Sequence, residues 1–108
     1  MAYTEPYDKM DSKTLDISKA ITSLREELEA IDWYNQRVAT ASDEELKRIM
    51  AHNRDEEKEH AAMLIEWVRR NMENWDKELH DYLFTTEPLG THEAPADSRN
   101  ADLGIGKL

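Results

Sequence analysis

Apolar residues recur through the first part of the chain at alternating steps of four and three residues. Between positions 11 and 71 there is neither glycine nor proline, and residues that favour helices are plentiful. Steps of three and four place the apolar residues on one side of a helix as a continuous seam. The seam consists of Ile17, Ile21, Leu24, Leu28, Ile31 and Val38, with Asn35 where one more apolar residue is expected.

A second long helix is predicted from Asp43 to about Arg70. The segment Thr40–Asp43 interrupts the first pattern, and Ser42 followed three residues later by Glu45 forms a capping box that starts a new helix. The connection is short, so the two helices are expected to be antiparallel neighbours. The second seam reads Leu46, Ile49, Met50, Asn53, Glu57, His60, Leu64, Trp67 and Val68.

The C-terminal third divides into a short helix, a linker and an apolar end. Trp75, Leu79, Tyr82 and Leu83 have helical spacing, and this helix is expected to end near Thr85. Residues 86–101 contain two prolines and a glycine and are typical of a flexible linker, whereas residues 102–108 are apolar again. The prediction is an all-α fold over residues 1–85: an antiparallel two-helix hairpin plus a short C-terminal helix.

Polar residues interrupt both seams at one level of the predicted hairpin. Glu57 and His60 occupy seam positions three residues apart and share a helix face, while Glu27 lies beside the first seam. Glu27 precedes Ala41 by 14 residues, and Glu57 and His60 follow it by 16 and 19. At about 1.5 Å per residue, the three lie roughly 21 to 28 Å from the turn. They therefore form one layer of the hairpin.

Carboxylates in such a layer favour a bound cation. A carboxylate buried without a partner costs several kcal/mol, on the order of 3–5, and neighbouring carboxylates repel one another. A cation removes both penalties, and carboxylate with imidazole suits iron, manganese or zinc. The alternative is that Glu57 and His60 face solvent and the seam passes through Glu56 or Ala61 instead.

The chain carries only half of a known ligand set. Ferritin-like di-iron proteins use a glutamate and histidine three residues apart on each of two helices, with one glutamate from each of two others. A two-fold homodimer of this chain would supply Glu27, Glu57 and His60 twice and would also cover the exposed seams. The hairpin is therefore expected to dimerise into a ferritin-like four-helix bundle.

The composition is consistent with a protein that attracts cations. Charged residues make up 35% of the chain, and its formal net charge is −10. This charge argues against a nucleic-acid partner and raises the local cation concentration, although it also serves ordinary solubility. The absence of cysteine excludes thiolate ligands and disulfides. Neither a signal peptide nor a membrane span is found, so a soluble cytoplasmic protein is expected.

Two dense stretches, residues 26–36 and 52–63, resemble the encapsulated ferritins, and the likeness extends over residues 14–85. The resemblance implies a ferroxidase that oxidises Fe(II) at a di-iron site between two protomers, for iron storage. It also implies a decameric ring, a pentamer of dimers, housed in an encapsulin nanocompartment. Rival interpretations of the same scaffold are a metal-free helical adaptor and a di-iron or manganese peroxidase.

The resemblance also assigns individual residues. It implies Glu27, Glu57 and His60 as ligands of two iron ions per dimer interface, with Tyr34 close to that centre. It further implies a second, entry-side site for an additional divalent cation. That site comprises Glu26, Glu29 and Trp33.

The last residues of the chain fit the same family. Leu103, Ile105 and Leu108, separated by glycines, resemble a C-terminal targeting peptide that docks on the encapsulin shell protein. A few apolar anchors on a flexible tether can hold a cargo through effective concentration.

Overall fold

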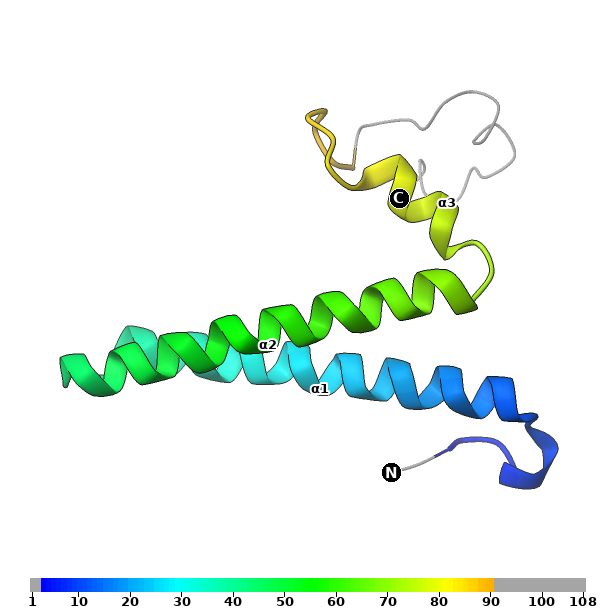
Figure 1. Cartoon of the computed structure of the whole chain (residues 1–108), viewed down its shortest axis with the longest axis horizontal. Coiled ribbons are helices and arrows are strands. Elements are labelled where there is room, and N and C mark those ends of the chain that lie inside the picture. Colours follow the sequence, from blue (N-terminus) through cyan, green and yellow to red (C-terminus); the bar gives the residue numbers. More distant parts are fainter. Residues whose placement is uncertain (1–2, 91–108) are drawn as a thin grey trace. The chain divides into compact units, whose positions relative to one another are not determined.

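The computed structural model describes residues 3–90, and every regular element in that range is helical (Figure 1). A 3-10 turn at Tyr7–Lys9 precedes the long helices α1 (Ser12–Thr40) and α2 (Glu44–Asn71), and the short helix α3 is Trp75–Tyr82. The predicted all-α hairpin with a short third helix is confirmed. None of the helices in the described range is long and apolar enough to span a membrane.

Helix α1 is bounded by a side-chain cap at Asp11 and by an extended residue at Ala41. The side chain of Asp11 accepts a hydrogen bond from the backbone N–H of Thr14 at 2.8 Å, which satisfies a donor of the first turn. At the other end Ala41 adopts an extended backbone, with ψ of 138°, and the helix stops. The 29 residues between these points form one uninterrupted helix.

The predicted capping box at Ser42 is wrong by one residue. The cap of α2 is Asp43, whose carboxylate accepts from the N–H of Leu46 at 2.8 Å. Aspartate caps a helix as well as serine does, and its charge also faces the positive end of the helix dipole. Glu44 and Glu45 in the first turn, with Arg69 and Arg70 in the last, complement the same dipole.

The two long helices pack along their length, but the hairpin covers only one side of its apolar surface. Within the described residues, the buried apolar residues are Ala20, Ala61 and Val68. Three residues predicted for the seams are exposed instead: Leu28, Leu46 and Ile49. Asn35 is exposed too, while its neighbour Tyr34 is partly buried. The four-and-three spacing therefore spans two faces, one against the other helix and one uncovered.

An uncovered band runs along α2. We call Leu46, Ile49, His60 and Met63 the open stripe, because their spacing places them on one side of the helix and all four retain substantial exposure. Met63 is 57% exposed. Apolar side chains spaced in this way favour packing against a further helix.

The described residues after Met72 belong to a second unit of the chain. Helix α3 follows Asn74, which has a left-handed backbone with φ of 73°, and it ends at Tyr82 rather than near Thr85. Leu83 is extended and closes the helix by donating its N–H to the carbonyl of Leu79 at 2.9 Å. The predicted targeting peptide at 102–108, and the predicted linker beyond residue 90, lie outside the described residues and stay predictions.

The cap of α2 gives a first prediction. Replacing Asp43 with Ala removes the acceptor for the Leu46 N–H and should lower the free energy of unfolding by about 1 kcal/mol. Chemical denaturation at fixed protein concentration measures this change. Ser42→Ala is the matched control and should cost less than about 0.5 kcal/mol, as for an ordinary surface substitution. A larger loss of stability for Ser42→Ala than for Asp43→Ala would instead identify Ser42 as the cap.

Candidate metal centre

Three potential metal ligands converge near the middle of the hairpin. Glu27 comes from α1, and Glu57 and His60 come from α2, one turn apart. Their ligand atoms all lie within 4.8 Å of one another. His60 Nδ1 is 3.0 Å from Glu57 Oε1 and 3.5 Å from Glu27 Oε1. The layer predicted from residue counts is therefore formed in three dimensions.

The cluster lies at the edge of the hairpin rather than inside it. The side chains of Glu27 and Glu57 are 24% and 23% exposed, and that of His60 is 43% exposed. The three side chains lie between the two helices, yet one side of the cluster remains open to solvent. Three ligands leave several positions of an iron ion unfilled, because iron commonly takes five or six ligands on the order of 2 Å away.

The electrostatics show how tightly these groups interact. A hydrogen bond between the two carboxyls raises the pKa of Glu27 and lowers that of Glu57. Burial adds to the rise at Glu27 and opposes the fall at Glu57. The hydrogen bond to Glu57 raises the pKa of His60, and the negative charge of Glu27 acts in the same direction. A proton between these atoms offsets their repulsion, which is the task a metal ion performs more completely.

The donor set fits a first-row divalent metal. Carboxylate oxygens and an imidazole nitrogen are ligands that iron, manganese and zinc accept. The absence of cysteine from the chain makes a thiolate site impossible. Within the described residues, Glu27, Glu57 and His60 are the group of histidine and acidic side chains close enough to share an ion.

The other predicted site residues are placed differently. Tyr34 lies on α1, two turns from Glu27, partly buried, with the guanidinium of Arg37 5.2 Å from its ring centroid. Glu26, Glu29 and Trp33 are all exposed on α1. In residues 3–90, Glu26 and Glu29 belong to no group of three or more histidine and acidic side chains close enough to share an ion. The entry-side site therefore stays a prediction.

Sequence reasoning missed a neighbour of the site, Arg54. It precedes Glu57 by three residues, and its side chain is only 22% exposed. Its Nη1 donates to the side-chain oxygen of Asn35 on α1 at 3.0 Å. The signals were present in the sequence, since Arg54 has the spacing of a helix-face neighbour and Asn35 interrupts the first seam.

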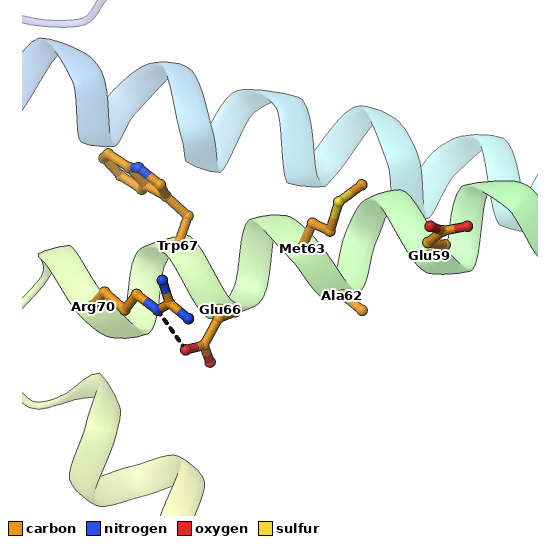
Figure 2. A pocket seen from close by; sticks show the side chains of 6 residues that line it. All are labelled: Glu59, Ala62, Met63, Glu66, Trp67 and Arg70. Atoms are coloured by element: carbon orange, nitrogen blue, oxygen red, sulfur yellow. Dashed lines mark hydrogen bonds and ion pairs between the residues drawn. The ribbon is translucent and has the colours of Figure 1, made fainter.

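Beyond His60 the outer surface of α2 is hollowed into a shallow groove (Figure 2). Met63 and Trp67 line one border of the groove, while Glu66 and Arg70 line the other and are joined by an ion pair of 2.7 Å (Figure 2). The lining is more apolar than polar. The surface that continues from the ligand cluster is thus suited to contact with protein.

Comparison with known proteins gives consistent matches. The model of the EncFtn-like family matches residues 2–86. A "Ferritin-like protein" from Thermotoga maritima is 49% identical over 98% of this chain and 96% of its own length. An "Encapsulated ferritin-like protein" from Rhodospirillum rubrum is 53% identical over 83% of this chain, which spans 64% of that relative. The crystal structure of protein ne0167 from Nitrosomonas europaea is similar with a TM-score of 0.80 and 61% identity, covering 82% of this chain and 98% of that one.

The raised pKa of His60 predicts how stability without metal depends on pH. Protonated His60 stabilises the folded chain fully below its ordinary pKa of 6.5, and this contribution is lost as pH rises through the higher folded value. The free energy of unfolding in chelator, measured from pH 6 to pH 9, should therefore fall more for the parent than for His60→Gln. His52→Gln is the control, since His52 is exposed on α2 and outside the cluster. Parallel curves for parent and His60→Gln would contradict the prediction.

Proposed function

The chain belongs to the EncFtn-like family, and from this membership and the open ligand cluster we propose that it is a ferroxidase whose site is completed by a second copy of the chain. One observation carries the proposal. Glu27, Glu57 and His60 form half of a ferritin-like ligand set, with ligand atoms within 4.8 Å, at an uncovered edge of the hairpin.

Dimerisation would meet two needs of the hairpin at once. The open stripe and the exposed Leu28 require apolar partners, and the ligand cluster requires further ligands. A two-fold axis beside His60 brings the same patch of each copy together, which doubles the ligands to four carboxylates and two imidazoles. The bundle that results has four long helices, as ferritin-like di-iron proteins do.

The proposed reaction uses Fe(II) as substrate and dioxygen as oxidant. Each Fe(II) gives up one electron, so two ions reduce one dioxygen with two protons to hydrogen peroxide, or four ions reduce it with four protons to two water molecules. The carboxylates of Glu27 and Glu57 hold the substrate ions and balance their rising charge. The imidazole of His60 must lose its proton to bind metal, so its raised pKa couples binding to proton release.

The names of the relatives suggest where the reaction takes place. One of them is called an encapsulated ferritin-like protein. We propose that this chain too is an iron-handling cargo of an encapsulin shell, held there through residues 102–108. The exposed acidic face at Glu26 and Glu29, with Trp33 beside it, would draw Fe(II) toward the dimer site. Ten chains in a ring of five dimers is the proposed assembly.

The ferroxidase proposal predicts the effect of removing single ligands. Anaerobic Fe(II) followed by air should give oxidation that is more than about tenfold slower for Glu57→Gln or His60→Ala than for the parent, because the site loses metal affinity. Oxidation is followed by Fe(III) absorbance and oxygen uptake. Glu45→Gln is the matched control, an exposed glutamate in the first turn of the same helix, and should behave as the parent. Equal oxidation rates in all four proteins would exclude this site. If the parent protein holds no iron after Fe(II) loading, the alternative of a metal-free helical adaptor is favoured.

The shared site also predicts that iron favours the dimer. Metal that binds only across the interface stabilises the dimer, and the stabilisation grows as the metal concentration rises above its dissociation constant. Native mass spectrometry of the parent should therefore show a larger dimeric or higher-order fraction with Fe(II) than with chelator. His60→Ala keeps the rest of the open stripe and should lose this dependence. Iron bound by a monomer with no change in assembly would refute the shared site.

A further inference from the structure

Arg54 is placed where it could disable the ligand cluster. It precedes Glu57 by three residues on α2, a spacing at which arginine and glutamate ordinarily pair. A guanidinium is charged at all relevant pH values and binds both oxygens of a carboxylate in a planar fork. Paired in this way, it would occupy the oxygens that a metal ion needs and would cancel one charge of the site.

The structure shows this guanidinium directed elsewhere. Its Nη1 donates to Asn35 Oδ1 across the hairpin at 3.0 Å, and its Nε donates to Asp55 at 3.1 Å. Glu57 is left to His60, 3.0 Å away, and to Glu27. Among the described residues, the ion pair of Arg54 is with Asp55 and not with Glu57.

The hydrogen-bond partner of Arg54 on α1 is Asn35. It lies on α1, eight residues after Glu27, on the side toward the turn, or roughly 12 Å along the axis. Arg54 therefore extends away from the ligand layer in order to reach it. Asn35 is also the polar residue that interrupts the first apolar seam, a position that the ligand set does not explain.

We propose that Asn35 is a positioning residue for the metal site: its side-chain oxygen holds the Arg54 guanidinium away from Glu57 and keeps the ligand carboxylates open to metal. This inference rests on the proposed function, because it presumes that Glu57 binds a cation. Asn35 acts through Arg54 and touches no ligand itself. Its effect must therefore disappear when Arg54 has no charge.

A double-mutant cycle tests this dependence. Co²⁺ serves as the probe, because it binds carboxylate and imidazole without needing an oxidant, and its visible absorption reports the ligand geometry. In Asn35→Leu the released Arg54 can pair with Glu57 and compete with the metal for its carboxylate. Co²⁺ binding should therefore weaken about fivefold, which is the upper range for a partly exposed ion pair. Arg54→Gln alone should bind at least as tightly as the parent. Asn35→Leu combined with Arg54→Gln should match Arg54→Gln.

A matched control exists at the open end of the hairpin. Lys13 on α1 donates to Asn71 Oδ1 on α2 at 2.9 Å, another bond between a cation and an asparagine that joins the same two helices. Asn71 is 11 residues from His60. Asn71→Leu should therefore leave Co²⁺ affinity unchanged. Circular dichroism and native mass show whether each variant keeps its helices and assembly, and Asn35→Ala replaces Asn35→Leu where the larger side chain alters either.

Each outcome has one meaning. The proposal is overturned if Asn35→Leu and Asn35→Ala both bind Co²⁺ as the parent does, or if the double variant stays weak. It is also overturned if Arg54→Gln alone weakens binding, since Arg54 would then support the site rather than threaten it. Co²⁺ binding by His60→Ala with parental affinity and spectrum, or no binding by the parent, overturns the proposed function itself and the role of Asn35 with it.

Discussion

The meeting of two carboxylates and an imidazole in one layer of an otherwise apolar hairpin is the constraint on which the rest of the structure depends. The ligand atoms of Glu27 on α1 and of Glu57 and His60 on α2 lie within 4.8 Å of one another, and His60 is within hydrogen-bond distance of Glu57. Such a group is unfavourable to cover without a cation. The hairpin therefore keeps it at an edge, and the same edge carries exposed apolar side chains. Under the proposed function, a metal and a second chain together resolve both features.

The sequence predicted the fold and this layer because both follow from simple periodicities. A glutamate and a histidine three residues apart share a helix face, and similar residue counts from a short turn bring residues on antiparallel helices to about the same level. What periodicity cannot distinguish is which of two adjacent faces meets the other helix. Leu28, Leu46 and Ile49 fitted the predicted seams and are exposed, because a stripe with steps of three and four is wide enough to serve two contacts.

Details set by competing polar groups were less predictable. Both Ser42 and Asp43 can cap a helix, and the outcome depends on which side chain reaches the Leu46 N–H in the folded turn. Arg54 had several acceptors within reach along its own helix, and only the three-dimensional pairing of the helices shows that it bonds to Asn35. The fit of Glu26, Glu29 and Trp33 to an entry site rests on family likeness, since all three are exposed on one hairpin.

Division of the site between two chains would link chemistry to assembly. A hairpin that held all its ligands would bind metal as a monomer, whereas half a ligand set binds weakly until a partner contributes the other half. Linkage then requires that metal favour the dimer as strongly as the dimer favours metal. The cost is an exposed cluster of carboxylates in every unpaired chain, which any nearby cation can neutralise. Because Arg54 is the cation three residues from Glu57 on the same helix, the bond that holds it to Asn35 helps to decide whether the half-site remains available to metal.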